Sequence, residues 1–565
     1  MKTPKHQTLQ RASALFCALF ATAHDSRADL ARGTRGMVAS VNPIASQAGI
    51  DAMKSGGNAI DAAVAMGLTL GVVDGYNSGI GGGCFMLIHR ASGEIIALDG
   101  REMAPSRATR DMFVRDGKGD TRLSQTGALA SGIPGSVAVY ERAAKRFGRK
   151  KWADLLLPAA QIAETGFVLN AAYAGRLQST TADLEQFPAS RAIFFEADGT
   201  VLDEGDTLRQ TDLANSYRAL AREGAGWFYR GEYARKTGAW MAQNGGLLSA
   251  RDFARYKLVE RQPIETTYRG LRVISFPPPS SGGVHVAQIL KVLENFPLNR
   301  LSELGRTHVV AEAMKLAFAD RAFWLGDPDF TPVPRGLVDA KYGRELARRI
   351  QLGAATPVPS HGAPPDFDRR VFEKHTTHFS AADAQGNWVA CTATVNTSFG
   401  SKVVIPGTGI LLNNQMDDFS IQPGVPNAFQ LVGSEANAVA PGKRPLSSMS
   451  PTLVLRGKTP ILSLGAAGGP TIISQTVLNL VGILDLGLPI DAALAQPRFH
   501  HQWRPDEVRL ESALPDFIKR GLEAKGHRLD EIDSMGAAQI VGRDVFGNGF
   551  VGAADPRTGG LALGF

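Results

Sequence analysis

Cysteine is scarce in this 565-residue chain, which has only three. Cys17 lies in an N-terminal segment that we expect to be removed, which leaves Cys84 and Cys391. Two cysteines cannot build a disulfide framework in a protein of this size, so we expect each to be buried as a small hydrophobic side chain. The chain also lacks C-x-x-C and H-E-x-x-H motifs, and the adjacent His500 and His501 do not have the spacing of helical metal ligands. We therefore expect no metal site and no cofactor.

Blocks of like charge are also missing. The formal net charge is +7, and residues before position 29 contribute +3 of it, from Lys2, Lys5, Arg11 and Arg27 against Asp25. The remaining +4 (7 − 3) is spread over a large protein, without a basic stripe interleaved with aromatic residues. Nucleic acid is therefore not expected to be a partner.

No apolar run is long enough to cross a membrane. The run Ala12–Ala23 is far shorter than the roughly 20 residues that a spanning helix needs. Basic residues precede it, and small residues suited to cleavage follow at Ala21-Thr22-Ala23 and Ser26-Arg27-Ala28. This pattern predicts a signal peptide over residues 1–28, with its end at 23 or 28, and hence a periplasmic or secreted protein with no membrane partner.

Glycine, by contrast, is abundant, and one cluster reads Ser78-Gly-Ile-Gly-Gly-Gly. A helix capped by Asn58 precedes it and a strand ending near His89 follows, which is the reverse of the order in dinucleotide-binding loops. We therefore expect a close backbone approach at the start of a buried strand. A hairpin partner, Glu94–Leu98, leads to Arg101, whose planar guanidinium suits carboxylate recognition.

Two segments rich in Thr, Val, Phe and Trp predict a β-hairpin. They are Thr376–Asp383 and Trp388–Val395, and Ala-Gln-Gly-Asn between them is typical of a turn. If the turn is centred near Gln385, paired residue numbers sum to about 770 and Thr376 lies opposite Thr394. Thr-rich segments also favour strands for structural reasons alone, so the hairpin by itself does not establish a site.

The rest of the chain mixes helices with further hairpins. Ser131–Arg349 is mainly helical, and Thr356–Arg369 is typical of an exposed, mobile connector. A loop over Gln422–Arg444 precedes a hairpin that runs into Gly468 and Gly469, just ahead of a helix. N–H groups there could bind an oxyanion, although the same pattern is typical of an ordinary strand-to-helix turn. Alternating hairpins and helices favour a layered α/β or α+β sandwich.

Long strings of the sequence resemble the γ-glutamyltransferase (γ-glutamyl transpeptidase) family. They follow one order along almost all of the chain after the signal: S-G-I-G-G-G, L-D-G-R-E, P-P-P-S-S-G-G, T-T-H-F-S, N-T-S-F-G-S, L-L-N-N-Q-M-D-D-F-S, K-R-P-L-S-S-M-S-P-T and R-F-H-H-Q-W. The resemblance implies an α+β fold of the N-terminal-nucleophile hydrolase type, an αββα four-layer sandwich. It also implies a precursor that cuts itself between His375 and Thr376, giving a heterodimer of residues 29–375 and 376–565.

The resemblance also implies roles for individual residues. Thr376 would be the nucleophile, with its freed α-amine as the base, and Thr394 would orient it. Positions that match the family's glutamyl site grip the α-carboxylate (Arg101, Ser447 and Ser448), surround the α-amine (Asn396, Gln415 and Asp418) and form the oxyanion hole (Gly468 and Gly469). The expected substrates are glutathione and other γ-glutamyl amides, with water, amino acids or peptides as acceptors.

Two departures from the family pattern are visible. Phe429 stands where many bacterial relatives place a tyrosine on a lid over the glutamyl site, and we expect a lid that packs apolarly and favours hydrolysis. The oxyanion turn reads G-A-A-G-G rather than G-S-P-G-G, from which we expect a modest effect. The alternatives are a glutaryl or cephalosporin acylase of the same fold, which the amine-binding residues Gln415 and Asp418 oppose, and an inactive secreted binding relative.

Overall fold

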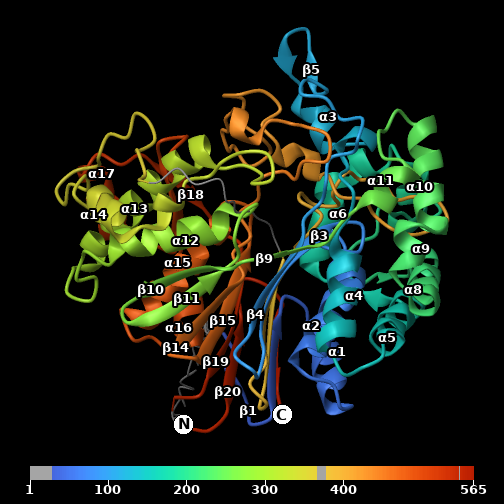
Figure 1. Ribbon diagram of the computed structural model, residues 1–565, viewed down its shortest axis with the longest axis horizontal. Helices are drawn as coiled ribbons and strands as arrows, with labels where there is room; N and C mark the ends of the chain where they lie inside the picture. Colours follow the sequence, from blue (N-terminus) through green and yellow to red (C-terminus); the bar gives the residue numbers. More distant parts are fainter. Residues whose placement is uncertain (1–27, 366–376, 546) are drawn as a thin grey trace, which may run out of the picture.

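Two seven-stranded sheets lie face to face at the centre of the computed structural model, which describes residues 28–365, 377–545 and 547–565 (Figure 1). The first sheet has the order β21 (Leu561–Gly564), β2 (Gly36–Ser40), β12 (His378–Asp383), β13 (Trp388–Thr394), β3 (Gly83–His89), β4 (Ile95–Gly100) and β9 (Val259–Arg261). The second has the order β1 (Ala31–Gly33), β20 (Phe550–Ala554), β19 (Ala537–Arg543), β15 (Thr459–Ala467), β14 (Thr452–Arg456), β11 (Leu271–Ser275) and β10 (Ile264–Tyr268).

Apolar side chains from both sheets fill the space between them. The ring of Phe85 in the first sheet stacks on that of Phe276, just after β11, with centroids 4.2 Å apart. Trp388 and Leu453 belong to the same fully buried cluster. This layer buries the inner face of each sheet, which is what holds two sheets together.

Helices cover the outer face of each sheet, on opposite sides of the molecule (Figure 1). On the first sheet lie α1 (Pro43–Lys54), α2 (Ala59–Val73) and α4 (Ser136–Phe147), with α5 (Trp152–Thr165) and α8 (Thr211–Glu223) outside them. On the second lie α12 (Ser281–Leu293), α15 (Thr471–Leu484) and α16 (Ile490–Ala495), with α13 (Glu303–Trp324) against α12. The predicted four-layer αββα sandwich is therefore confirmed.

Smaller elements complete the described chain. The helices are α3 (Thr121–Gln125), α6 (Ala171–Leu184), α7 (Pro188–Phe194), α9 (Ala225–Tyr229), α10 (Glu232–Gln243), α11 (Ala250–Arg255), α14 (Ala340–Ala347) and α17 (Asp516–Ala524). The short strands are β5 (Val114–Arg115), β6 (Lys118–Gly119), β7 (Phe167–Val168), β8 (Thr207–Leu208), β16 (Phe499–His500), β17 (Val508–Glu511) and β18 (Leu529–Ile532).

The predicted hairpin has the expected register. His378 pairs with Thr392 and Ala382 with Trp388, so the numbers of paired residues sum to 770. The carbonyl oxygen of Thr377 accepts a hydrogen bond from the N–H of Ala393 (2.5 Å). Thr376 lies outside the described residues, so the predicted pair of Thr376 with Thr394 stays a prediction.

The glycine cluster makes the expected close approach. A Cβ atom at Gly81 would lie 1.9 Å from the carbonyl oxygen of Leu411, and one at Gly82 would lie 1.9 Å from that of Thr394. Asn58 caps the preceding helix α2 with a reciprocal capping box to Asp61. The rigid helix and the side-chain-free turn together bring the start of β3 against the end of β13.

The connector prediction is only partly right. Residues 366–369 lie outside the described part of the chain. In residues 356–365, some side chains are exposed, but others pack against the rest of the protein. The N–H of Thr356 donates to Glu312 (2.8 Å), and Trp503 Nε1 donates to the carbonyl oxygen of Val358 (2.7 Å). Thr356 and Val358 are buried, because these polar anchors and one apolar side chain offset the Pro and Gly content that predicted exposure.

Both sheets combine strands from either side of position 376. In the first sheet, β12 lies between β2 and β13, and in the second, β14 lies between β15 and β11.

Cys84 and Cys391 are buried free thiols within the first sheet, as predicted. No helix in the described ranges is long and apolar enough to cross a membrane. Residues 1–27 of the predicted signal peptide (1–28) lie outside those ranges, and Ala28 is the first described residue.

Candidate active site

A buried ion pair joins Arg101, just beyond β4, to Asp418 at the end of a short 3-10 turn, Gln415–Asp418. Arg101 Nη2 donates to Asp418 Oδ2 at 2.6 Å, and both side chains are at most 1% exposed. The same guanidinium donates to the carbonyl oxygens of Pro445 (3.1 Å) and Leu446 (3.3 Å). Arg101 thereby ties the predicted amine-binding turn to the segment that carries the predicted carboxylate-binding serines.

The predicted amine-binding side chains gather around Asp418. Gln415 Nε2 donates to Asp418 Oδ2 (2.7 Å), and Asn396 Nδ2 donates to the carbonyl oxygen of Asn414 (3.1 Å). The hydroxyl of Thr394 accepts a hydrogen bond from the N–H of Asn396 (2.7 Å), which is held at a φ of 83°. The strand end, the 3-10 turn and the intervening loop thus present several polar atoms to one place.

Ser447 and Ser448 lie on the neighbouring segment. Asn437 holds this segment to the 3-10 turn, since its Nδ2 donates to the carbonyl oxygen of Asp418 (2.6 Å) and its Oδ1 accepts from the N–H of Leu446 (2.9 Å). Ser280, from P-P-P-S-S-G-G, forms a parallel bridge to Ser447. The structure therefore brings together all six predicted substrate-binding residues, although their roles stay predictions.

Several polar atoms of this cluster are buried without a hydrogen-bond partner among the described residues. They include the hydroxyl oxygens of Ser447 and Ser448, Oδ1 of Asn396 and Oε1 of Gln415. A buried polar atom left without a partner costs roughly 1–3 kcal/mol, so such atoms are rare in a core. Four of the six predicted substrate-binding residues carry such an atom, which indicates a site suited to a polar ligand.

Glu102, next to Arg101, is a charged residue for which the sequence predicted no role. Its Oε2 lies 3.5 Å from Arg101 Nη1, and its Oε1 has no partner in the described part of the chain. The carboxyl occupies the space beside Gly83, where a Cβ atom would lie 2.5 Å from Oε2. Burial raises the pKa of Glu102 to about 7, against the lowering effect of Arg101.

Arg321 on α13 is a second residue that the sequence did not reveal. It is 4% exposed, and its Nε donates to the hydroxyl of Ser281 (3.1 Å), which in turn donates to the carbonyl oxygen of Ser447 (3.3 Å). No described carboxylate forms an ion pair with it. Burial lowers the pKa of Arg321 to about 10, and Asp418 opposes that shift. The same helix carries other charged residues, among them Glu312, Lys315 and Asp320, so nothing in its sequence singled out Arg321.

Gly468 and Gly469 form the turn between β15 and α15, at φ angles of 127° and 59° that favour glycine. The ring of Phe429 packs on this turn. A Cβ atom at Gly469 would lie only 2.7 Å from Phe429 Cδ1. The N–H of the preceding residue, Ala428, donates to Asp417 (2.9 Å). The Gln422–Arg444 loop thus connects the predicted oxyanion turn to the ion-pair cluster, and its predicted apolar packing is present.

His375 and Thr376, the predicted cleavage site and nucleophile, lie outside the described residues. Within the described ranges, no group of three or more His, Cys, Asp or Glu side chains could hold a metal ion. The chemistry that the described residues offer is therefore recognition of a charged, polar ligand beside a turn with two glycine N–H groups.

Known proteins with similar sequences were identified along nearly the whole chain. Residues 45–565 match the family described as Gamma-glutamyltranspeptidase. The glutathione hydrolase proenzyme of Escherichia coli (strain K12) is 45% identical over 540 residues, covering 93% of this chain and 91% of the relative. The protein of the same name from Pseudomonas sp. (strain A14) is 40% identical over 580 residues, covering 99% and 100%. Among solved structures, a cephalosporin acylase from Bacillus halodurans has a TM-score of 0.86 at 28% identity, covering 98% of this chain and 99% of that one.

Proposed function

Because the chain belongs to the gamma-glutamyltranspeptidase family, we propose that it is a glutathione hydrolase and γ-glutamyltransferase in which Thr376 is the nucleophile. The observation that carries this proposal is the cluster of buried, partnerless polar atoms beside the Arg101–Asp418 ion pair. An α-amino acid end, with one carboxylate and one ammonium, supplies the donors and acceptors that this cluster lacks.

The precursor activates itself by one internal acyl shift. The Thr376 hydroxyl attacks the carbonyl carbon of His375, the peptide C–N bond breaks, and the nitrogen takes up the proton as the new α-amine. Water then hydrolyses the resulting ester, which restores the hydroxyl and leaves a carboxylate on His375. Both sheets are built from strands on either side of this bond, so the polypeptides 29–375 and 376–565 stay associated.

The new α-amine is the base for the next reaction. An α-amine has a pKa near 8, so a substantial fraction is unprotonated close to neutral pH, unlike a lysine side chain. It accepts the Thr376 hydroxyl proton while the oxygen attacks the γ-carbonyl carbon of the donor. The amine of the leaving group takes up a proton, and water or an amino acid then removes the γ-glutamyl group from the threonine.

Charge complementarity determines how the site binds the α-amino acid end of the γ-glutamyl donor. Ser447, Ser448 and Arg101 hold the α-carboxylate, with the buried cation Arg321 behind the serine segment. Asp418, Gln415 and Asn396 hold the α-ammonium. Ionised partners roughly double the strength of a hydrogen bond, and a desolvated charge without its counterpart is costly, so this pocket selects a zwitterion.

The N–H groups of Gly468 and Gly469 stabilise the tetrahedral oxyanion. Preorganised donors of this kind contribute about 3–4 kcal/mol each in acyl-transfer enzymes. Phe429 covers the turn but cannot donate a hydroxyl hydrogen bond across the glutamyl site. We expect a lid that closes less firmly and a balance shifted toward hydrolysis.

The acylase alternative would use this fold, since the cephalosporin acylase from Bacillus halodurans has a similar structure, and we expect it to use the same nucleophile. A glutaryl group, however, has no α-amine, and it would leave the buried carboxylate of Asp418 without an ammonium partner. The inferred signal peptide over residues 1–28 belongs to the same proposal, which places the enzyme in the periplasm or outside the cell.

Comparing γ-glutamyl and glutaryl anilides tests the assignment. We expect kcat/KM for the γ-glutamyl anilide to exceed that for the glutaryl anilide by at least about 10-fold, since each hydrogen bond between the ammonium and a charged group contributes about 1.5–3 kcal/mol. A preference for the glutaryl compound would instead identify an acylase. Thr376→Ala is the matched control, and it should remain one uncut chain without turnover of either anilide.

A further inference from the structure

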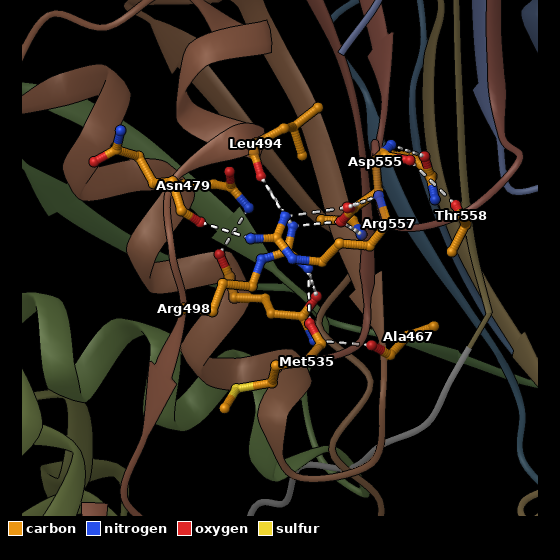
Figure 2. A network of polar contacts seen from close by, with 12 residues as sticks. Ala467, Asn479, Leu494, Arg498, Met535, Asp555, Arg557 and Thr558 are labelled. Atoms are coloured by element: carbon orange, nitrogen blue, oxygen red, sulfur yellow. Dashed lines mark hydrogen bonds and ion pairs between the residues drawn. The ribbon is translucent and has the colours of Figure 1, made fainter. Parts of the chain in front are cut away.

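A buried network of charged side chains lies directly behind the Gly468–Gly469 turn. Arg498, the first residue of R-F-H-H-Q-W, is at its centre, between Leu494 and Met535 and facing Asp555 (Figure 2). Its Nη1 donates to the carbonyl oxygen of Met535 (2.8 Å), and its Nη2 forms an ion pair with Asp555. The proposed function gives this motif no role.

The network reaches the turn through Gln475 on the first turns of α15. Arg498 Nη1 donates to Gln475 Oε1 (2.9 Å). Gln475 Nε2 in turn donates to the carbonyl oxygen of Ala467 (2.8 Å) and to the hydroxyl of Thr471 (3.0 Å). That hydroxyl donates to the carbonyl oxygen of Gly468 (2.8 Å). Gln475 is fully buried, and every polar atom of its side chain has a partner.

These contacts hold the two carbonyl groups whose peptide planes contain the oxyanion donors. The carbonyl of Ala467 shares a planar peptide with the N–H of Gly468, and the carbonyl of Gly468 shares one with the N–H of Gly469. In a trans peptide the N–H points opposite to the C=O. Fixing both carbonyls toward α15 therefore directs both N–H groups to the other side.

The surroundings leave little room for another arrangement. We call the side chains of Gln475 and Thr471, with the carbonyl groups that they hold, the clasp. A Cβ atom at Gly536 would lie 2.1 Å from Gln475 Nε2 and 2.4 Å from the carbonyl oxygen of Ala467, so only a glycine fits where the backbone at position 536 passes the clasp. Behind Arg498, Glu511 accepts hydrogen bonds from the N–H of Arg498 (2.9 Å) and from Arg557 Nη2 (2.6 Å). Two arginines and two carboxylates thus balance one another, which anchors the clasp to a rigid support.

We infer that Gln475, fixed by Arg498, is a positioning residue that aims the Gly468 and Gly469 N–H groups at the reacting carbonyl oxygen. The inference rests on the proposed function only in assigning those N–H groups to the oxyanion. Misplacing catalytic groups by about 1 Å costs roughly 100-fold in rate, so the clasp contributes to kcat without touching the substrate.

The test compares processed, two-chain preparations of the wild type, Gln475→Met and Thr471→Val. The measured quantities are kcat and KM for a γ-glutamyl anilide, and inhibition by a tetrahedral boronic acid analogue of the γ-glutamyl group and by glutamate. We expect kcat to fall roughly 10- to 100-fold in both variants, with boronate affinity falling by the same factor. KM and glutamate affinity should stay within about twofold, because the clasp touches neither end of the ground-state ligand.

Two further variants separate positioning from general damage. Thr471→Ser keeps the hydroxyl and should retain kcat. Tyr268→Phe removes a buried hydroxyl that donates to Asp485 (2.6 Å), just beyond the far end of α15, and should lower thermal stability without changing kcat. Unchanged kcat and boronate affinity in Gln475→Met would overturn the inference, as would an equal loss of boronate and glutamate affinity.

A wild type that turns over only glutaryl substrates would refute the proposed function but leave this inference open to the same test. The glutaryl anilide and a glutaryl boronate then replace the γ-glutamyl compounds, because the oxyanion turn would serve either acyl group. A loss of kcat and boronate affinity in Gln475→Met would still support the clasp, and their retention would still overturn it.

Discussion

The ion-pair cluster at Arg101 and the network at Arg498 are both buried and charged, yet they use their polar atoms differently. In the Arg498 network, among the described residues, the side chains of Gln475, Arg498, Asp555, Glu511 and Arg557 have no buried polar atom without a partner, and such atoms occur on the adjoining Asn479 and Gln539. The Arg101 cluster includes Ser447, Ser448, Asn396 and Gln415, each with such an atom. A saturated network gives rigidity, whereas an unsaturated one retains unmet hydrogen-bonding capacity for a ligand. The following variants test that distinction.

Asp418→Asn should produce the largest change in activity. It removes the charge partner of the substrate ammonium, so kcat/KM for a γ-glutamyl anilide should fall roughly 100- to 1,000-fold, equivalent to about 3–4 kcal/mol. Residual turnover of a glutaryl anilide, which has no ammonium, should fall much less. An equal loss for both substrates would mean that Asp418 only supports the fold.

Arg498→Met should produce the largest change in stability. Asp555 would lose its nearest cation in a buried site, and the free energy of unfolding should fall by about 3–5 kcal/mol in denaturant titrations. The matched control is Arg272→Met, which removes an exposed pair with Glu265 and should cost less than about 1 kcal/mol. If both variants lose the same stability, the Arg498 network is not the rigid support described above.

Glu102→Gln should remove a pH dependence of stability. The pKa of Glu102 is raised from 4.5 to about 7 in the folded protein, so between these values the folded chain binds more protons than the unfolded one. The free energy of unfolding therefore falls as pH rises through this window, by up to about 3 kcal/mol. Unfolding at pH 5 and pH 8 should show this fall in the wild type relative to Glu102→Gln, and parallel profiles would contradict it.

Ser448→Ala should separate binding from stability. Removing a buried hydroxyl that has no partner should leave stability unchanged or raise it by up to about 1 kcal/mol, while KM rises about 10-fold from the lost contact with a carboxylate. Ser190→Ala is the control, because that hydroxyl donates to the carbonyl oxygen of Lys402 (2.6 Å). It should lose about 1 kcal/mol of stability with no change in KM.

Phe429→Tyr should have the smallest effect. A hydroxyl on the lid ring would add one hydrogen bond over the glutamyl site and raise the ratio of transfer to hydrolysis by about 2- to 10-fold. The ratio is measured with a dipeptide acceptor at fixed donor concentration. An unchanged ratio would show that apolar packing of Phe429 on the Gly469 turn is sufficient for closure.

Local patterns in the sequence predicted much of the fold. The hairpin register followed from turn chemistry and strand composition, and the Asn58 cap from a short capping motif. Arg321, Asn437 and the clasp at Gln475 were not predictable, because each depends on contacts between segments far apart in the chain. Gln475 lies in a helix whose pattern reads as an ordinary buried face, and only the fold places its amide against the carbonyl of Ala467.

For the connector Thr356–Arg369, by contrast, the sequence led to a prediction that was partly wrong. Pro and Gly content predicted exposure after Thr356, but hydrogen bonds from Thr356 to Glu312 and from Trp503 to Val358 dock its first part. Composition indicates the tendency of a segment in isolation, whereas a few hydrogen bonds to distant residues determine its position in the fold.

Intact mass analysis of the denatured protein, taken during turnover of a γ-glutamyl anilide without acceptor, tests the central claim most directly. We predict two polypeptides, with the smaller one beginning at Thr376 and part of it heavier by one γ-glutamyl group. A single uncut chain, or a cut chain that turns over the anilide without ever carrying the group, would contradict the claim that Thr376 is both the cleavage point and the nucleophile.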